Sequence, residues 1–321
     1  MSNPQPGELP SLFSRNNVAV ITGAASGIGR LMAGKIAALG GRLILWDVNQ
    51  GALETFGEEL KKQNYSVSTY ACDLSDKDAI YATAEAVRQA HNTVDILINN
   101  AGIVAGRPLL EESDADIIRT FAVNALALFW TTRAFLPDML KRNSGHIVTV
   151  ASAAGLVGTP RLIDYCSSKF AAVGYDDALR VELKRQRSNV TTTVICPYFI
   201  NTGMFQGAKT RFPWLLPILE PEYVADRIIG AIRTNRQRII MPRFVFLTYL
   251  VRLLPPSLFD AVMGFLGVNK SMDEFTGRLG HESQFWLKLI LTIFCRVGSL
   301  SAHLSPPDYP QLSKRTTHIQ P

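Results

Sequence analysis

The sequence has few charged side chains and no long acidic or basic tract. Lysine, arginine, aspartate and glutamate make up 19% of the 321 residues, with a formal excess of six positive charges. A basic excess can indicate a nucleic-acid partner. Here, however, six arginines are interleaved with apolar side chains between Arg227 and Arg252, and no acid lies among them. This mixture of arginines and apolar side chains is more typical of a membrane surface than of a nucleic-acid site, and we expect no nucleic-acid partner.

Metal-binding patterns are also lacking. The four cysteines have no metal-type spacing, and the five histidines are scattered along the chain. Cysteines of this kind are typical of buried or reduced thiols, and we expect no metal. The cysteines are Cys72, Cys166, Cys196 and Cys295.

Long hydrophobic runs are lacking as well. The first 17 residues are polar and contain proline, with no apolar core long enough for a signal peptide. The apolar block 285–297 is shorter than the roughly 20 residues needed to span a bilayer. We therefore expect no membrane-spanning helix, and we expect disordered segments at 1–16 and 299–321.

The chain does have a regular alternation of strand and helix patterns from Val18 to Met241, without an internal repeat. Such alternation predicts an α/β fold with a doubly wound parallel sheet of the Rossmann-like kind. We expect residues 17–242 to form one domain and residues 243–298 to form an apolar helical extension.

A glycine-rich turn follows the first expected strand. The buried strand from Val18 to Thr22 runs into Gly23-Ala-Ala-Ser-Gly27-Ile-Gly29, and a helical pattern follows. Glycine lets the backbone turn tightly and approach a ligand, and a helix N-terminus attracts phosphate. The spacing differs from the commonest dinucleotide-binding fingerprint, but the flanking strand and helix are in place. The turn predicts a pyrophosphate site.

Asp47 ends the second expected strand, twenty residues after Gly27. A carboxylate there accepts hydrogen bonds from the ribose hydroxyls of adenosine and repels a 2′-phosphate. The structural alternative is an aspartate that caps the helix beginning near Gln50. Ser26 precedes Gly27, so no basic side chain is available for a phosphate at that position. We therefore expect NAD(H) rather than NADP(H).

Ser152, Tyr165 and Lys169 form a pattern suited to proton transfer. Tyr165 and Lys169 are four residues apart, so they share one face of a helix. A nearby ammonium group favours the phenolate and lowers the tyrosine pKa from its free value of about 10. The Ser152 hydroxyl can hold a substrate oxygen while Tyr165 exchanges the proton. The pattern predicts acid–base chemistry on an alcohol or ketone, although an ordinary amphipathic helix with a surface lysine has the same spacing.

Together and in this order, these motifs resemble the short-chain dehydrogenase/reductase family over residues 17 to about 242. The resemblance implies an NAD-binding catalytic domain in which Asp73 contacts the adenine and the turn from Pro197 to Thr202 holds the nicotinamide. Tyr198 departs from the family, which often has glycine there. The implied catalytic residues are Asn124, Ser152, Tyr165 and Lys169. The implied cofactor contacts are Gly23, Ser26, Gly27, Ile28, Gly29, Asp47, Asp73, Leu74, Asn99, Ala101, Gly102, Tyr165, Lys169, Pro197, Ile200 and Thr202.

Further segments resemble the branch of the family that contains epidermal retinal dehydrogenases and lipid-droplet 17-beta-hydroxysteroid dehydrogenases. They are residues 45–49, 134–137, 145–155, 165–174, 200–205, 216–221 and 268–273. The resemblance implies a retinol-like or hydroxysteroid substrate, a homodimer, and a place on the cytosolic face of the endoplasmic reticulum or of lipid droplets. A cytoplasmic location is the alternative.

The loop from Tyr198 to Glu220 is expected to close the substrate pocket, because its apolar side chains suit a lipophilic molecule. They are Met204, Phe205, Phe212, Trp214, Leu215 and Leu216, and packing against the core or contact with a membrane is the alternative for each. Residues 227–252 and 285–297 suggest a peripheral contact with an anionic membrane. A solvated helix face and packing on the core remain the alternatives for these two segments.

Two rival functions share this fold. An NADPH-linked lipid ketone reductase is disfavoured by the carboxylate of Asp47. A non-catalytic, NAD-bound scaffold on membranes or lipid droplets is disfavoured by the complete set of Asn124, Ser152, Tyr165 and Lys169.

Overall fold

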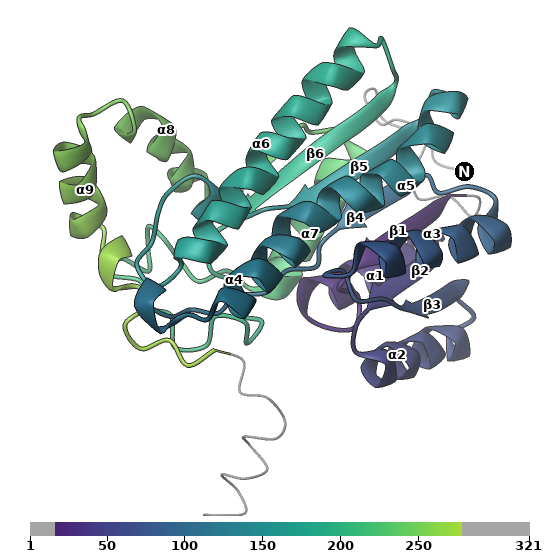
Figure 1. Ribbon diagram of the computed structural model, residues 1–321, viewed down its shortest axis with the longest axis horizontal. Coiled ribbons are helices and arrows are strands. Elements are labelled where there is room, and N and C mark those ends of the chain that lie inside the picture. Colours follow the sequence, from purple (N-terminus) through teal and green to yellow (C-terminus); the bar gives the residue numbers. More distant parts are fainter. Residues whose placement is uncertain (1–16, 278–321) are drawn as a thin grey trace, which may run out of the picture. The chain divides into compact units, whose positions relative to one another are not determined.

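The computed structural model describes residues 17–277, which contain a seven-stranded sheet with helices on both faces (Figure 1). The strand order is β3-β2-β1-β4-β5-β6-β7, and every neighbouring pair is parallel. This confirms the predicted doubly wound parallel sheet. The strands are β1 (Val18–Thr22), β2 (Arg42–Asp47), β3 (Val67–Ala71), β4 (Ile96–Asn99), β5 (Gly145–Val150), β6 (Val190–Pro197) and β7 (Arg238–Met241).

The helices divide between the two faces of the sheet, with one apolar core on each side. Helices α1, α2 and α7 contribute to the first core, and α3, α5 and α6 contribute to the second. They are α1 (Gly27–Ala38), α2 (Gln50–Lys62), α3 (Lys77–His91), α4 (Asp114–Phe121), α5 (Ala127–Arg142), α6 (Ile163–Arg185) and α7 (Pro221–Arg233). Short helical turns lie at η1 (Leu109–Glu111), η2 (Ala122–Leu126) and η3 (Ala153–Gly155).

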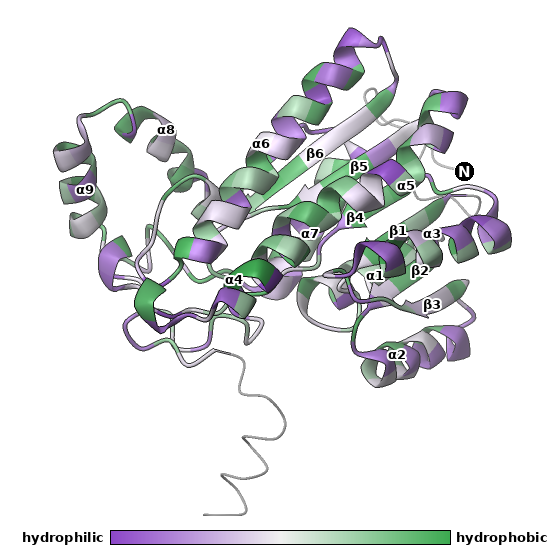
Figure 2. Cartoon of the chain, viewed as in Figure 1, coloured by the Kyte–Doolittle hydropathy of each residue, from purple (hydrophilic) through white to green (hydrophobic). Residues whose placement is uncertain are grey.

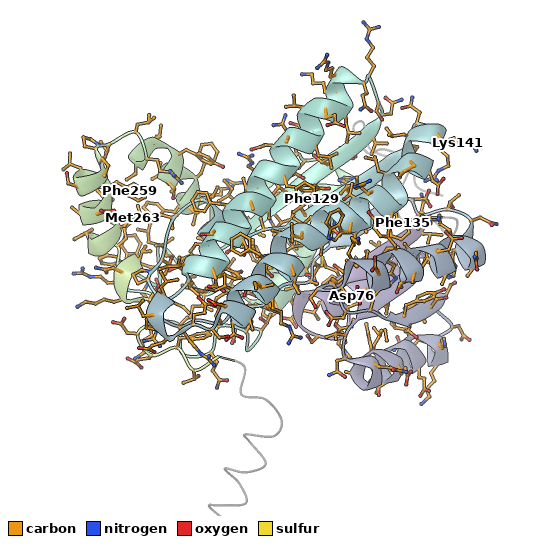
Figure 3. All side chains as sticks on the ribbon, in the orientation of Figure 1. Asp76, Phe129, Phe135, Lys141, Phe259 and Met263 are labelled. Atoms are coloured by element: carbon orange, nitrogen blue, oxygen red, sulfur yellow. The ribbon has the colours of Figure 1, made fainter. Side chains whose placement is uncertain are left out.

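The continuous apolar strands follow from burial on both faces. Ala19 and Ile21 of β1 face the first core, whereas Val18 and Val20 face the second, because side chains alternate along a strand. In the second core the ring of Phe135, which is labelled in Figure 3, packs against the ring of Trp46 with 5.8 Å between the ring centres. Hydropathy follows the same plan, with hydrophobic strands inside and a largely hydrophilic α2 outside (Figure 2).

Local signals explain where several helices begin. Asp76 caps α3 by accepting hydrogen bonds from the backbone N–H groups of Asp78 and Ala79 (Figure 3). Asn49 caps α2 by accepting one from Ala52. Between α4 and α5, however, η2 is a π-helical turn, a distortion that is frequent at functional sites and that no sequence signal here announced.

The segment after β7 contains η4 (Arg243–Leu247), α8 (Thr248–Val251), α9 (Pro256–Phe265) and η5 (Val268–Lys270). Val245 is buried in a core with Leu128, but Leu253 of the same segment is 81% exposed. Within residues 17–277, no helix is long and apolar enough to cross a membrane. The expected disordered ends, Cys295, the block 285–297 and the rest of the extension beyond residue 277 lie outside the described residues.

Two of the arginines assigned to a membrane surface are tied to the protein instead. Arg238 donates hydrogen bonds to both carboxylate oxygens of Asp177, each at 2.6 Å. Arg252 donates one to the carbonyl oxygen of Leu156 at 2.7 Å. The interpretation of 227–252 as a uniform headgroup-facing stretch is therefore wrong for these two side chains, because α6 and η3 supply their partners.

Candidate active site

The carboxyl ends of the parallel strands meet at one edge of the sheet, where the chain order reverses between β1 and β4. Crevices at this position bind ligands in open α/β sheets. A cavity of about 230 Å³ lies there. Its walls include the glycine turn, Asp47, Ser152, Tyr165 and Lys169, so segments far apart in sequence converge on one space.

The glycine turn has the geometry that the sequence suggested. Gly23 has a φ of 64°, which suits glycine and few other residues. A Cβ on Gly29 would lie 2.1 Å from the carbonyl oxygen of Gly23, so Gly29 lets α1 approach the turn. Gly29 does not line the cavity, unlike Gly23, Ser26, Gly27 and Ile28.

Asp47 lines the cavity and also supports the turn beside it. Its carboxylate accepts hydrogen bonds from the backbone N–H groups of Ala25 and Asn49, each at 2.9 Å. The alternative role as the cap of α2 belongs to Asn49. Asp47 thus combines a local structural role with a position from which a carboxylate can meet a ribose.

The remaining expected cofactor residues lie at the other strand ends. Asp73, Leu74, Ala101, Gly102, Pro197, Ile200 and Thr202 all line the cavity. Hydrogen bonding from the backbone N–H of Ser75 holds the pKa of Asp73 below its ordinary value. Arg119 lines the cavity too and lowers the same pKa. The sequence reading missed Arg119, for which no motif gave a signal.

Asn99 and Asn124 stand behind the cavity wall. The Asn99 side chain accepts a hydrogen bond from the Thr131 hydroxyl at 2.8 Å. Asn124, in the π-helical turn, bonds both the N–H and the carbonyl oxygen of Ile103 at 2.9 Å, and its amide donates to Ser168 at 3.0 Å. It holds the wall in place. The neighbouring Asn100 lines the cavity, and its amide donates to the Thr22 carbonyl oxygen at 2.9 Å.

Ser152, Tyr165 and Lys169 come together as the spacing predicted. All three are almost fully buried, with Ser152 the most exposed at 9%. The Lys169 ammonium lies 5.7 Å from the centre of the Tyr165 ring and donates a hydrogen bond to the Val150 carbonyl oxygen at 2.9 Å. Ser152 acts through hydrogen bonding to lower the pKa of Tyr165.

The net pKa shift of Tyr165 nevertheless has the opposite sign to the prediction. Burial raises the pKa of Tyr165 above its ordinary value, and this outweighs the effect of Ser152. Burial also lowers the pKa of Lys169 to about 8. The reason is that a desolvated site penalises the charged form of both groups, and this penalty exceeds the attraction between the ammonium and the phenolate that the spacing suggests.

The loop from Tyr198 to Glu220 divides into two parts. Met204 and Phe205 line the cavity, and the Phe205 ring packs edge-on at 5.5 Å from Tyr165. Phe212 instead packs against Trp214 and Phe265, and Leu216 is buried in the core with Val245. The expectation of a pocket wall therefore fails for Phe212 and Leu216, and Trp214 is 80% exposed.

Comparison with known proteins identifies the class of this protein. A sequence profile described as short chain dehydrogenase matches residues 17–211. The chain belongs to the short-chain dehydrogenase/reductase family.

Individual relatives narrow the resemblance to one branch. The short-chain dehydrogenase/reductase family 16C member 6 of Bos taurus is 44% identical over 264 residues, 81% of this chain and 84% of that protein. Human (Homo sapiens) epidermal retinol dehydrogenase 2 is 42% identical over 268 residues, covering 81% and 87% of the two chains. Human estradiol 17-beta-dehydrogenase 11 is 45% identical over 261 residues, covering 77% and 86%.

Solved structures share the fold and differ in their cofactors. A short chain dehydrogenase/reductase from Burkholderia phymatum, in complex with NAD, has a TM-score of 0.67 and 32% identity, covering 74% of this chain and 93% of that one. A metagenomic short-chain oxidoreductase in complex with NADP has a TM-score of 0.60 and 30% identity, covering 72% and 97%.

Proposed function

We propose that this protein is an NAD-dependent oxidoreductase that interconverts a lipophilic alcohol, of the retinol or hydroxysteroid kind, and its carbonyl. One observation carries the proposal: a single cavity is lined by Asp47 on the β2 side and by Ser152, Tyr165 and Lys169 on the β5 side. NAD(H), when bound, accepts or supplies the hydride. The family membership and the named relatives support this reaction class.

The side chains divide the work of proton transfer. Ser152 holds the substrate oxygen, and Tyr165 takes the hydroxyl proton during oxidation and returns it during reduction. Lys169, fixed by the Val150 carbonyl oxygen, supplies positive charge next to the ring. Because burial raises the pKa of Tyr165, the neutral phenol is the resting form, which suits proton donation to a carbonyl. In the oxidation direction Tyr165 takes the substrate proton as the phenolate, which forms after the phenol has released its own proton to solvent.

The cofactor preference rests on Asp47. Its carboxylate repels the extra phosphate of NADP, and the residues of the glycine turn that line the cavity offer no basic side chain. The structural neighbours bind either cofactor, so the preference must be measured. The test is the absorbance change of the reduced nicotinamide with retinoids, steroids and long-chain alcohols, using NAD(H) and NADP(H) in parallel. Faster turnover of these substrates with NADP(H) would reject the NAD assignment.

We also propose that the protein docks on the cytosolic face of the endoplasmic reticulum or of lipid droplets. Large apolar side chains stand exposed around α8 and α9: Trp214 at 80%, Phe246 at 59%, Leu250 at 61%, Leu253 at 81% and Phe265 at 63%. Arg236 and Arg243 are exposed nearby in sequence. Exposed apolar groups bordered by arginines suit an anionic interface, and a lipophilic substrate is dissolved in that phase. Flotation with liposomes tests the proposal, which fails if the protein stays soluble at low salt.

The homodimer implied by the family resemblance is a further proposal. Helices α4, α5 and α6 expose Ile118, Phe129 and Val181, which are 69%, 45% and 58% accessible. Burial of such side chains favours association. Light scattering of the full chain and of Phe129→Glu tests this: we expect a dimer that the substitution weakens, and a monomer at all concentrations would reject it.

A further inference from the structure

A second cavity, of about 550 Å³, lies beside the cavity that holds Tyr165. The two cavities share Gly102, Ile103 and Met204 as walls. The other walls of the second cavity are mixed: Val104, Ala105 and Phe275 are apolar, whereas Arg107, Glu111, Arg161 and Thr276 are polar. The apolar side chains of Ile103 and Met204 on the shared wall, continued by Val104 and Phe275, give a lipophilic molecule whose hydroxyl reaches Ser152 and Tyr165 a route into this second space.

Arg161 lines the second cavity without a partner of its own. Within residues 17–277 its side chain makes no hydrogen bond and no ion pair, and its Nε atom is buried and unsatisfied. A donor removed from water without an acceptor is unfavourable, and more so when the group is charged. Arg161 lines the second cavity and Tyr165 lines the first, and the two cavities share walls, so one ligand can extend from the reacting centre to Arg161.

The backbone conformation at Arg161 is one that most residues with a side chain disfavour. Its φ is +64°, a conformation that glycine adopts readily and that is uncommon for residues with a Cβ. The position thus carries a long cationic side chain where the backbone favours none. Folding does not explain this choice, because in the described residues the guanidinium stabilises no other group.

The charges facing the second cavity favour an anion. Arg107 also lines it, and its ion pair with Asp116 is long, at 3.4 Å, and exposed. Glu111 is the opposing charge on the wall, and it lies outside ion-pair distance of Arg161. Because Asp116 already pairs with Arg107, Arg161 is the guanidinium on this wall that has no carboxylate within ion-pair distance among the described residues, and it is the group that can receive an anion.

We propose that Arg161 binds an anionic group at the far end of the substrate, so that the enzyme acts on lipophilic alcohols that also carry a carboxylate, sulfate or phosphate. The apolar body lies along the shared walls at Ile103 and Met204, and the hydroxyl lies at Tyr165. The proposal rests on the oxidoreductase function above and specifies its substrate class.

The test compares each acid with its uncharged ester. The probes are the ω-hydroxy derivatives of octanoic, dodecanoic and hexadecanoic acid and their methyl esters, assayed with NAD. We expect kcat/KM for the best acid to exceed that for its ester by about tenfold or more, the size of a hydrogen bond to a charged group. Arg161→Gly should abolish this preference by lowering kcat/KM for the acid to the level of its ester, and Arg161→Lys should retain part of it.

Glycine suits the positive φ at position 161. The melting temperature of Arg161→Gly should therefore equal or exceed that of the unmodified protein. Equal use of acid and ester by the unmodified protein, or an unchanged ratio in Arg161→Gly, would overturn the proposal. If no alcohol is turned over, the oxidoreductase function itself fails. Equilibrium dialysis of hydroxydodecanoic acid against the unmodified protein and against Arg161→Gly still decides whether Arg161 binds the anion. Weaker flotation of Arg161→Gly with phosphatidylglycerol vesicles, at an unchanged acid-to-ester ratio, would make Arg161 a headgroup contact and likewise overturn the proposal.

Discussion

The two sides of the candidate active site are built differently. On the cofactor side, neighbouring strand ends supply contacts within a short stretch of chain, such as the hydrogen bond from Ala25 N–H to Asp47. On the substrate side, the loop after β6 is fastened to a segment more than sixty residues later. Lys209 N–H donates to the Ser271 carbonyl oxygen at 2.9 Å, and Thr276 N–H donates to that of Gln206 at 3.0 Å. The glycine turn and Asp47 on the cofactor side are therefore held together within one strand–helix–strand stretch, whereas the substrate side is held by contacts between segments more than sixty residues apart.

Tyr165 stands where the two sides meet, and its loss should have the largest effect. Tyr165→Phe removes the hydroxyl while keeping the ring that packs on Phe205. We expect turnover to fall at least about 100-fold, with NADH binding unchanged by fluorescence titration. Tyr175→Phe is the matched control, because its hydroxyl serves only Thr132 among the described residues. Equal activity of Tyr165→Phe and the control would remove the proposed mechanism.

Asp47 tests the cofactor side alone. Asp47→Ser should weaken NAD use and improve NADP use in relative terms, shifting the ratio of kcat/KM values by about tenfold or more, since the lost interactions involve a charged group. Asp47→Asn separates the loss of charge from the loss of local hydrogen bonds, because it removes the charge but keeps an acceptor for the backbone N–H groups of Ala25 and Asn49. The ratio of kcat/KM for the ω-hydroxy acid to that for its methyl ester, which reports on the substrate side, should not change in either variant. A ratio of NAD to NADP use that stays constant in both variants would contradict the role of Asp47.

Asp176 tests the stability of α6, the helix that carries Tyr165 and Lys169. It is fully buried, and burial first and then Asp177 raise its pKa from 3.8 to about 7. Thr192, Arg180 and Arg238 lower the pKa by smaller amounts. The folded protein keeps this proton to a higher pH than the unfolded chain does, so the free energy of unfolding falls as the pH rises from about 4 to about 7.

Asp176→Asn cannot ionise and should escape that loss. We expect its melting temperature to exceed that of the unmodified protein at pH 8 and to match it at pH 4. At the higher pH the free energies of unfolding of the two proteins should differ by at most about 4 kcal/mol. Asp177→Asn is the control: it should destabilise the protein, because Asp177 pairs with Arg180 and Arg238. A constant difference across the pH range would contradict the assignment to Asp176.

Exposed apolar residues near the substrate side should give the smallest effect. Leu253→Asp should reduce flotation with anionic liposomes several-fold, because partial burial of one leucine at an interface contributes about 1 kcal/mol. Leu110→Asp is the matched control, since Leu110 is 99% exposed on η1. Arg236→Glu with Arg243→Glu should weaken binding further in low salt. Arg238 is left intact in this test because it pairs with Asp177. Equal flotation of Leu253→Asp and Leu110→Asp would argue against docking through α8 and α9.

The elements of the fold, the glycine turn and the place of Asp47 at a strand end could be predicted because they depend on local patterns. The predicted strand Val18–Thr22 and the glycine turn after it are present as expected, since period, turn chemistry and strand ends leave few alternatives. The outcomes for Phe205 and Phe212 could not be predicted in this way. Both are aromatic residues on one loop, and only the position of Phe265, fifty-three residues after Phe212, draws Phe212 away from the cavity.

The sequence by itself determined the doubly wound sheet, the glycine turn, the acid at Asp47 and the pairing of Tyr165 with Lys169 on one helical face. Each follows from spacing along a single strand or helix. Only the tertiary structure decided that Tyr165 is buried deeply enough for its pKa to rise, that a π-helical turn directs Asn124 to Ile103, and that Arg161 faces a cavity without a partner. The physical reason is that desolvation and partner choice depend on every segment packed around a group, and those segments are distant in the chain.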